Sequence, residues 1–329
     1  MSPIYKGDSS DKEAFLRELE ARQRLHEFPP QVVIETTAAC NLTCAHCRHD
    51  AMARPVGHMP MALYRKIIDE IAARAPHTEV WPTFYGEAFL LDYRLFYMLQ
   101  YAKRRGLTNL VLNTNGTRFT AEVAEWVIES GLDLVMFSLD GFSPAVFESI
   151  RVGAHRDEVF ANVERLLAIK ARRRATTPRV EVQYSMMDTN EHEVDQFREY
   201  WLSRGADVKI REKLSWGGTV GADNLDGHMH RIACPWALRT CAIHWNGDMV
   251  ACAVDYEGRF VAGNVSTGSI GAIRTGPHRV LERQHLAHDF AGMPAPCRDC
   301  LDWQVAGGAE HYQAPARPRG PPTLTPARL

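Results

Sequence analysis

The stretch Thr36-Thr37-Ala38-Ala39-Cys40-Asn41-Leu42-Thr43-Cys44-Ala45-His46-Cys47 decides the fold, and it follows a strand-like segment at residues 31–35. Its cysteines have the spacing CxxxCxxC. Three thiolates on one short loop can bind three irons of a cubane iron-sulfur cluster and leave the fourth iron open, because soft sulfur ligands suit such clusters. The alternatives are unrelated buried thiols or a structural zinc site, which usually combines two cysteine pairs or cysteines with histidines. The loop therefore predicts a cluster with one open iron.

Composition and charge describe an ordinary cytoplasmic protein. The 329 residues are 45% hydrophobic and 24% charged, with a formal net charge of -2. This balance lacks the basic excess that favours nucleic acid or an anionic membrane as a partner. No apolar run is long enough to span a membrane, and residues 1–30 lack the apolar core of a signal peptide. Because the cytosol keeps thiols reduced, the eight cysteines are expected to bind metal or react rather than form disulfides.

Strand-like and helix-like segments alternate between residues 31 and 214. The expected strands are 32–35, 79–84, 109–113, 133–139, 180–186 and 207–213. Amphipathic stretches with helical spacing lie between them, at 62–75, 93–105, 121–130, 158–173 and 193–203. This alternation predicts an α/β fold of parallel strands joined by right-handed helical crossovers.

With its cysteine loop and this alternation, the sequence resembles the radical S-adenosylmethionine (SAM) superfamily. The resemblance implies a partial (β/α)6 barrel with its active site at the carboxyl ends of the strands. It also implies that Cys40, Cys44 and Cys47 hold a 4Fe-4S cluster whose open iron binds SAM. An electron from this cluster cleaves SAM, and the resulting 5'-deoxyadenosyl radical abstracts a hydrogen atom. The expected electron donor is a protein such as flavodoxin or ferredoxin.

The same resemblance assigns SAM contacts near the first two strands. His46 stands where the superfamily usually has an aromatic ring against the adenine, which suits stacking; alternatively it is a protonation site or a surface residue. The segment Tyr85-Gly86-Glu87 resembles the superfamily's GGEP segment, in which backbone and carboxylate receive the SAM ammonium group. Two departures are Tyr85 for the first glycine and Ala88 for the proline.

Further SAM contacts are expected near the ends of the third and fourth strands. The resemblance places the ribose or the methionyl carboxylate of SAM beside three polar side chains: Asn115, Ser138 and Arg151. Alternatively, the Asn-Gly and Asp-Gly pairs in these segments are simply turns between strand and helix.

A second group of cysteines follows the predicted barrel. Its spacing is Cys-x12-Gly-x4-Cys and then Cys-x2-Cys, formed by Cys234, Cys252, Cys297 and Cys300. Four thiolates can close a cluster completely, and a zinc ribbon is the alternative. The pair Asn246-Gly247 predicts a tight hairpin between the first two cysteines. The arrangement resembles the SPASM auxiliary-cluster domain in its shortened twitch form, with spacings similar to those of the 2-deoxy-scyllo-inosamine dehydrogenases, and this implies a second 4Fe-4S cluster.

These features divide the chain into four predicted parts. Residues 1–30 form an N-terminal extension, and residues 31–218 form the partial barrel. Residues 219–306 form the auxiliary iron-sulfur domain, whose few apolar runs suggest that metal stabilises it. Residues 307–329 are rich in proline and are predicted to be disordered.

The overall reaction depends on the fate of the substrate radical after hydrogen abstraction. A carbinol carbon that loses a hydrogen atom becomes a ketyl radical, and this radical becomes a ketone when it releases one proton and one electron. A fully ligated second cluster can accept that electron. Together with the resemblance, this predicts that the chain oxidises a secondary alcohol of a sugar-like or aminocyclitol small molecule, as in aminoglycoside antibiotic biosynthesis.

Several side chains are candidates for chemistry on the substrate. Lys209, Arg211 and Lys213 alternate along the last strand and therefore share one face. If the three bases point inward, they would orient substrate oxygens or assist deprotonation, and Arg211 and Lys213 are the predicted catalytic residues among them; if they point outward, they form a solvated face. Cys241 is either a buried apolar thiol, the common state of a free cysteine, or a thiol that returns a hydrogen atom to the substrate.

Other activities remain compatible with the sequence. Hydrogen return by Cys241 would make the enzyme an epimerase, and loss of a neighbouring hydroxyl would make it a diol dehydratase. A peptide- or protein-modifying maturase is less favoured, because the segment before residue 31 is short for a leader-binding domain. A non-catalytic metal scaffold or electron carrier would have no need for the Gly86-Glu87 loop.

Overall fold

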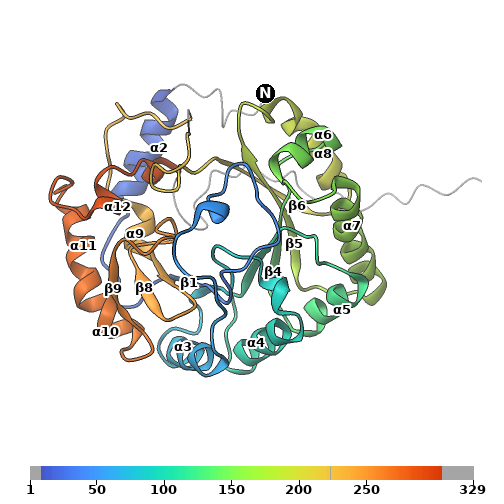
Figure 1. Cartoon of the computed structure of the whole chain (residues 1–329), viewed down its shortest axis with the longest axis horizontal. Helices are drawn as coiled ribbons and strands as arrows, with labels where there is room; N and C mark the ends of the chain where they lie inside the picture. The colour runs from blue at the N-terminus through green and yellow to red at the C-terminus, as the bar shows by residue number, and fades with distance from the viewer. Residues whose placement is uncertain (1–8, 223, 306–329) are drawn as a thin grey trace, which may run out of the picture.

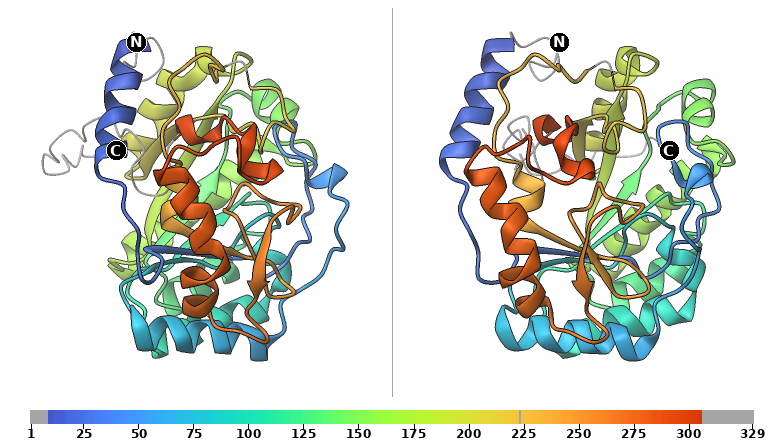
Figure 2. Two further views of the ribbon diagram at one scale, coloured as in Figure 1. Left: turned by 90° about the vertical axis from the view of Figure 1, so that its left-hand side faces the viewer. Right: turned by 60° about the vertical axis from the view of Figure 1, so that its left-hand side comes forward.

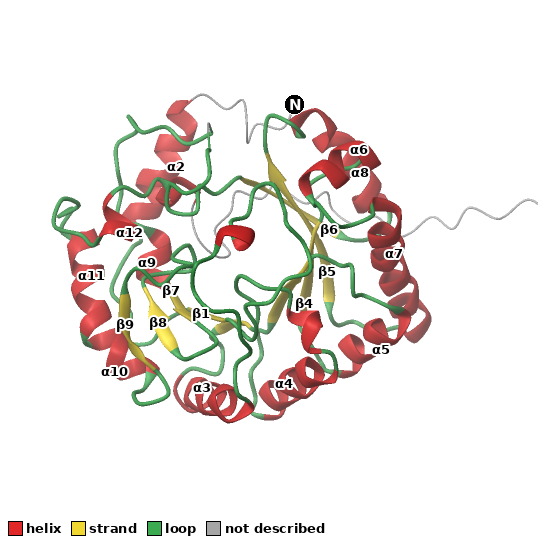
Figure 3. Cartoon of the chain, viewed as in Figure 1, coloured by secondary structure: helices red, strands yellow, loops and turns green. Residues whose placement is uncertain are grey.

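The computed structural model describes residues 9–222 and 224–305, which form a barrel of strands surrounded by helices (Figures 1 and 3). The strands are β1 (Gln31–Ile34), β2 (Glu79–Trp81), β3 (Val111–Thr114), β4 (Leu134–Ser138), β5 (Arg179–Met186), β6 (Asp207–Glu212), β7 (Thr240–Ile243), β8 (Asp248–Val250) and β9 (Val261–Asn264).

Helices connect these strands on the outside of the barrel. The α-helices are α2 (Ser9–Ala21), α3 (Met61–Arg74), α4 (Tyr93–Arg104), α5 (Ala121–Glu129), α6 (Pro144–Ile150), α7 (Arg156–Arg173), α8 (Val194–Ser203), α9 (Pro235–Arg239), α10 (Ile270–Thr275), α11 (Pro277–Leu286) and α12 (Ala295–Arg298). Short 3-10 helices are η1 (His49–Ala51), η2 (Ala88–Leu91), η3 (Glu191–Glu193) and η4 (Asp302–Val305).

Strands β1 to β6 are parallel neighbours in chain order, which confirms the predicted α/β fold. β1 pairs with β2, a bridge between Val80 and Leu110 joins β2 to β3, and the ladder continues through β6. The second strand ends at Trp81, earlier than expected, because Pro82 has no backbone N–H for the ladder. The carboxyl ends of these strands meet at one mouth of the barrel.

Alternate side chains along each strand point to opposite faces of the sheet, and the two faces have different surroundings. On β1, Val32 and Ile34 belong to the large apolar core between the sheet and the helices, whereas Val33 faces the barrel interior beside Trp81. The helices complete the outer core with apolar residues at helical spacing; for example, Ile67, Ile68 and Ile71 of α3 are buried. The interior side of the sheet therefore carries a separate, smaller apolar cluster, and the rest of it is available to polar side chains.

The C-terminal segment rejoins this sheet, which the sequence pattern did not predict. β7 pairs with β1 in parallel, with Cys241 opposite Val32, and β8 and β9 follow in antiparallel order. This pairing covers an edge of β1 that would otherwise expose unpaired backbone groups. The predicted hairpin is present, and its turn includes Gly247 at φ 96°.

Helix α2 lies across the open side of the barrel, beside the C-terminal helices (Figure 2). At one end Lys12 forms an ion pair of 2.9 Å with Glu212 of β6. Near the other end Glu20 accepts a hydrogen bond from the backbone N–H of Ala233 and pairs with His288. Helix α2 therefore links the last parallel strand to the C-terminal segment.

The predicted domain boundaries at residues 30, 218 and 306 stay predictions. The proposed disordered tail at 307–329 lies outside the described residues. Among the helices of residues 9–222 and 224–305, none is both long enough and apolar enough to cross a membrane.

A buried ion cluster anchors helices α10 and α11 to the C-terminal strands. The carboxylate of Glu282 pairs with Arg274 and Arg279, and Arg274 also donates a hydrogen bond of 3.0 Å to the carbonyl oxygen of Thr240. All three side chains are buried. The single carboxylate therefore balances two cations that are removed from water.

We predict that Glu282→Ala lowers the free energy of unfolding by about 3–5 kcal/mol, because it leaves buried guanidinium groups without their counter-ion. Urea denaturation followed by circular dichroism would measure the change. The matched control is Glu158→Ala on the exposed face of α7, which should change stability by no more than about 0.5 kcal/mol. Equal effects of the two substitutions would contradict the prediction.

Candidate active site

The loop that carries Cys40, Cys44 and Cys47 follows β1 and crosses the mouth of the barrel (Figure 1). The Thr36 hydroxyl at its start donates a hydrogen bond of 2.8 Å to the carbonyl oxygen of Pro82. Further along, the N–H of Cys47 donates to the carbonyl oxygen of Cys44 at 3.0 Å and closes a tight turn. The three thiols are therefore displayed from one fixed loop at the strand ends, as the sequence predicted.

Gly86 lies directly against this loop. A Cβ atom at position 86 would lie 2.4 Å from the carbonyl oxygen of Thr37 and 2.5 Å from that of Ala39. The next residue, Glu87, donates its backbone N–H to the same Ala39 oxygen at 2.8 Å. A side chain at position 86 would separate the two segments, so this close approach requires glycine.

The carboxylate of Glu87 ties the end of β2 to the end of β3. Oε1 accepts hydrogen bonds from the N–H of Phe89 and the hydroxyl of Thr114, and Oε2 accepts one of 2.7 Å from the N–H of Asn115. Burial raises the pKa of Glu87, and these donors counteract that effect. Because Oε2 accepts only this bond among the described contacts, it keeps capacity for the predicted SAM ammonium contact, which stays a prediction.

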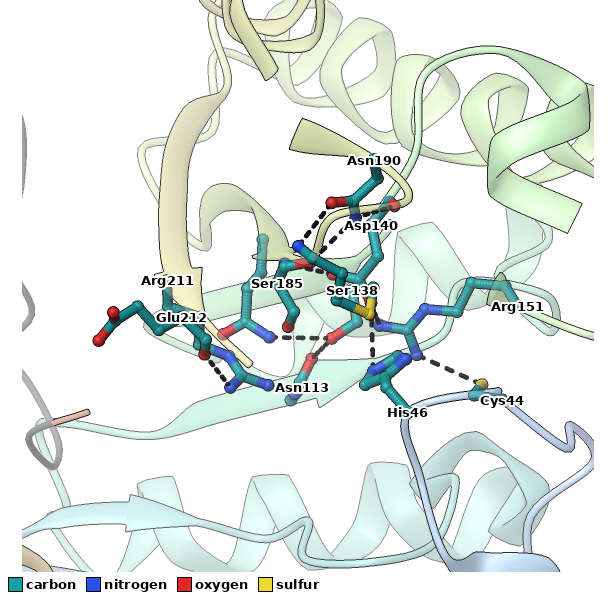
Figure 4. A network of polar contacts seen from close by, with 12 residues as sticks. Cys44, His46, Asn113, Ser138, Asp140, Arg151, Ser185, Asn190, Arg211 and Glu212 are labelled. Carbon is teal, nitrogen blue, oxygen red and sulfur yellow. Dashed lines mark hydrogen bonds and ion pairs between the residues drawn. The ribbon is translucent and has the colours of Figure 1, made fainter. Parts of the chain in front are cut away.

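Asp140 forms the centre of a buried polar network beside the cluster loop (Figure 4). Its Oδ2 forms an ion pair with Arg151 and lies 3.4 Å from Nε2 of His46. Its Oδ1 accepts a hydrogen bond from the N–H of Ser185. Burial alone would raise the pKa of Asp140, but the neighbouring Arg151 cation holds it below its ordinary value. The carboxylate is therefore anionic at neutral pH.

His46 and Arg151 both connect this network to the cluster loop. Burial lowers the pKa of His46 to about 3, so the imidazole is neutral, and its Nδ1 has no hydrogen-bond partner among the described residues. The guanidinium of Arg151 lies 3.6 Å from the sulfur of Cys44. A cation at that distance stabilises a thiolate ligand, and thiolates are what an iron-sulfur cluster requires. The three thiols and their surroundings thus fit the predicted cluster.

The other predicted SAM contacts also lie around the mouth, though in different directions. The amide of Asn115 donates a hydrogen bond of 3.0 Å to Asn41 on the cysteine loop. Ser138 donates one of 2.8 Å to Asn113 on the neighbouring strand. Tyr85 stacks on Tyr256 with a centroid separation of 4.7 Å, so its ring faces the C-terminal segment. Direct contact of these residues with SAM stays a prediction.

The second group of cysteines surrounds one cavity in the C-terminal segment. Its lining includes Cys234, Cys252, Cys297 and Cys300. Nowhere in residues 9–222 and 224–305 do three or more His, Cys, Asp or Glu side chains converge as they would on a single metal ion. The thiols instead surround a space, as the ligands of a polynuclear cluster do.

The chemistry of this cavity fits an iron-sulfur cluster. Burial raises the pKa of Cys234 to about 11 and that of Cys297 to about 12, so iron binding must displace protons. His285 also lines the cavity and accepts a hydrogen bond from the N–H of Cys234 at Nδ1. Burial lowers the pKa of His285 to about 3, so its proton lies on Nε2, which has no partner among the described residues. An N–H donor is thus available to a cluster sulfur.

A second cavity lies inside the barrel. Polar side chains from neighbouring strands line one side of it: Asn113 of β3, Gln183 of β5, and Lys209 and Arg211 of β6. Aromatic and aliphatic side chains form much of the remaining wall, including Trp81, Trp216 and Val254. The inward direction of Lys209 and Arg211 agrees with one of the two alternatives that the sequence left open.

Trp216 connects the two cavities and the cysteine loop. It lines both cavities, together with Val254. Its indole N–H donates a hydrogen bond of 2.9 Å to the carbonyl oxygen of His46, and its ring meets Tyr85 edge to face at 5.0 Å. Trp216 and Val254 therefore belong to the wall that the two cavities share.

Two predicted catalytic residues do not reach the interior cavity. Lys213 lies beyond the end of β6 and is not part of the lining. Cys241 is fully buried in the core between the sheet and the helices. It pairs with Val32, so it shares the outward face of the sheet, whereas Ala242 faces inward beside Val33. This position agrees with the alternative in which Cys241 is a buried apolar thiol, and its role as a hydrogen donor stays an untested prediction.

Sequence reasoning missed Asp140 and Trp216, and it left the role of Lys209 open. The Asp-Gly pattern places Asp140 in a turn, although its position directly after a buried strand was a usable signal; its φ is 59°. Lys209 is absent from the predicted catalytic residues, although it shares a strand face with them. Trp216 lies just before the predicted domain boundary at residue 218, and no local pattern could have shown that it lines two cavities.

The close packing at Gly86 leads to a prediction. Gly86→Ala should displace the cysteine loop and lower the rate of reductive SAM cleavage by about 100-fold, because ångström-scale misplacement of reacting groups has effects of that size. Chromatographic measurement of 5'-deoxyadenosine with dithionite as reductant would test this. The control is Gly227→Ala, where an added Cβ meets nothing within 4 Å. Unchanged SAM cleavage in Gly86→Ala would contradict the packing argument.

Relatives of known structure share this architecture. BtrN in complex with AdoMet and 2-DOIA has a TM-score of 0.59 with 16% identity, covering 84% of this chain and 94% of that protein. Streptococcus suis SuiB bound to the precursor peptide SuiA has a TM-score of 0.64 with 11% identity, covering 90% and 74%. At these identities the likeness shows the fold alone.

Sequence comparisons identify the family. The mycofactocin maturase MftC of Mycolicibacterium smegmatis is 25% identical over 326 residues, which cover 85% of this chain and 78% of MftC. Residues 34–200, half of the chain, match the Radical SAM superfamily, and residues 234–301 match the SPASM iron-sulfur cluster-binding domain. The chain therefore belongs to the radical SAM superfamily, with SAM, a 4Fe-4S cluster and an auxiliary iron-sulfur cluster in its C-terminal SPASM domain as cofactors.

Proposed function

We propose that this enzyme oxidises a secondary alcohol of a sugar-like or cyclitol-like small molecule to a ketone. One observation carries the proposal: the interior cavity and the cavity of the second cysteine group share Trp216 and Val254 in their walls. A substrate radical in the first cavity would lie next to an electron acceptor in the second. Net oxidation of the substrate requires such an acceptor, whereas epimerisation does not.

The proposed reaction balances in atoms and electrons. The carbinol carbon loses a hydrogen atom to the 5'-deoxyadenosyl group, and the remaining ketyl radical forms the carbonyl by releasing its hydroxyl proton to solvent water and one electron to the acceptor. The SAM cluster and the auxiliary cluster, when bound, supply the electron for SAM cleavage and accept the electron from the substrate. A flavodoxin or ferredoxin is the proposed external donor.

The side chains of the cavity suit a polyhydroxylated ring. Asn113 and Gln183 offer amide donors and acceptors for hydroxyl groups, and Arg211 offers further donors. The faces of Trp81 and Trp216 can pack against the apolar C–H faces of a ring. The proposed SAM ligands lie at the mouth of the barrel, where Asp140 contacts both Arg151 and His46 of the cysteine loop.

Similarity to solved structures supports a small-molecule substrate without fixing it. BtrN, which has the same fold, was solved with AdoMet and 2-DOIA.

Arg211 is the one predicted catalytic residue that lines the cavity, and we retain it as a substrate-orienting group. Its guanidinium group stays protonated at all relevant pH values, so it cannot accept the hydroxyl proton. Cys241 faces away from this cavity, so an epimerase that uses it as hydrogen donor is disfavoured.

Peptide modification is the second candidate. It is favoured by the 25% identity to the mycofactocin maturase MftC across most of this chain. A peptide substrate would have to present one side chain to the interior cavity. A panel of substrates that includes peptides can therefore distinguish the two candidates.

The first test concerns the auxiliary cluster. A variant with Cys40, Cys44 and Cys47 replaced by alanine, reconstituted without oxygen, should retain a 4Fe-4S cluster held by the second cysteine group. Iron, sulfide and zinc analysis with Mössbauer spectroscopy would measure it. Zinc, or no metal, would remove the electron acceptor and overturn the proposal.

The second test separates SAM cleavage from oxidation. Cys252→Ala should still form 5'-deoxyadenosine but lose at least about 90% of ketone formation, because the substrate electron has no acceptor. The matched control Cys241→Ala, with its thiol in the outer core, should retain both products. The substrates are a panel of cyclitols and hexoses deuterated at the carbinol carbons, together with synthetic peptides. Deuterium transfer from peptides alone would favour the maturase, and ketone formation by Cys252→Ala would refute the electron route.

A further inference from the structure

The interior cavity has a distinctive arrangement of charge. Lys209 and Arg211 occupy alternate positions on β6, so both face the interior, and they are the only charged residues among those that line this cavity in the described part of the chain. Figure 4 shows the Arg211 guanidinium on the side of Asn113 and the carboxylate of Glu212 on the other side of the strand. The charges that a bound molecule meets are therefore positive.

Among residues 9–222 and 224–305, the Lys209 ammonium group has no hydrogen-bond acceptor and no ion-pair partner. The residue is only 8% exposed. The Nζ lies 5.7 Å from the centroid of the Trp81 ring. Burial lowers the pKa of Lys209 to about 8, so most of the side chain is protonated at neutral pH. A buried cation without an acceptor is costly, and an anionic ligand would remove that cost.

The carboxylates behind Lys209 do not fill this role. Oε1 of Glu79 accepts hydrogen bonds of 2.6 Å from both Gln31 and Trp81. Glu181 is buried and is not part of the cavity lining. Both carboxylates favour the charged form of Lys209. The two carboxylates explain how the fold tolerates the charged Lys209 side chain, and Lys209 itself still lines the cavity.

Arg211 supplies a second group of donors on the same side. Its Nη1 donates a hydrogen bond of 3.1 Å to the carbonyl oxygen of Glu212. A guanidinium has several N–H donors in a planar fork that matches carboxylate and phosphate geometry, so it can bind an anion in addition to its contacts within the protein. The two cations and the amide of Asn113 together resemble the donor set of an anion site.

We infer that Lys209 and Arg211 bind an acidic group of the substrate, a carboxylate or a phosphate. This inference rests on the proposed function, because it takes the interior cavity as the substrate site. It narrows the substrate to an anionic polyol such as a sugar acid or sugar phosphate. An amine-bearing cyclitol would bring an ammonium group toward two cations, and like charges in a partly buried site oppose binding.

The carboxylate of SAM is a second possible source of the same chemistry. The two sources differ in one testable respect. A site for the SAM carboxylate is filled once SAM is bound, whereas a substrate site stays open and accepts an anion together with SAM.

Sulfate is a suitable probe, because its charge is constant across the neutral range. Isothermal titration calorimetry of sulfate into the anaerobically reconstituted holoenzyme, with and without saturating SAM, would measure the site directly. We expect saturable binding in both conditions. Lys209→Gln and Arg211→Gln should each weaken binding by at least about tenfold, the usual effect of losing a charged hydrogen-bond donor. Lys213→Gln is the matched control, since it removes a cation outside the cavity and should leave binding unchanged.

Each result decides the inference. Lys209→Arg keeps the charge and should keep sulfate binding, which separates loss of the cation from general damage, and iron content and circular dichroism verify the fold of each variant. Absence of saturable binding, equal weakening by Lys213→Gln, or loss of binding when SAM is present would overturn it. None of these measurements needs turnover. Sulfate binding can therefore be absent while ketone formation is observed, or present while ketone formation is not, and the two proposals are tested separately.

Discussion

The buried carboxylate of Asp140 connects three parts of the barrel mouth that are distant in sequence. It pairs with Arg151 at the end of α6, approaches His46 on the cysteine loop, and accepts the backbone N–H of Ser185 on β5. Its backbone oxygen also accepts a hydrogen bond from Asn190. Removing one partner of such a pair costs about 3–5 kcal/mol, because the other charge stays buried without compensation. This satisfied charge therefore helps to hold the cysteine loop above the strands, together with the contacts of Gly86 and Trp216.

Local patterns predicted the barrel because each βα unit is encoded within a short stretch of chain. The apolar run of β5 and the helical spacing of α3 indicate their structures without knowledge of distant residues. The pairing of β7 with β1 could not be found in this way, since it joins segments about two hundred residues apart. Short strands such as β7 and β8 also contain too few residues to show a period.

The same distinction applies to the site. The cysteines could be predicted because ligand spacing is a local property that cluster chemistry constrains strongly. The roles of Arg211, Lys213 and Cys241 depend on which face of the strand each side chain occupies and on where the strand ends. A shift of one residue in the pairing or in the strand end changes both. Cys241 faces outward because it pairs with Val32, and a shift of one residue would have placed it inside. Trp216 and Lys209 gain their importance only from the tertiary structure.

The pairing of β7 with β1 also determines how the two groups of cysteines lie relative to each other. Because β7 continues the sheet beside β1, the segment that carries Cys234 and Cys252 is fixed to the strand that precedes the cysteine loop. Helix α2 adds a second attachment through Lys12 and Glu20. These attachments keep Trp216 in the wall that separates the two cavities. An auxiliary domain on a flexible linker would not hold an acceptor at a constant distance from the substrate, so the proposed oxidation is favoured by the pairing that local sequence did not reveal.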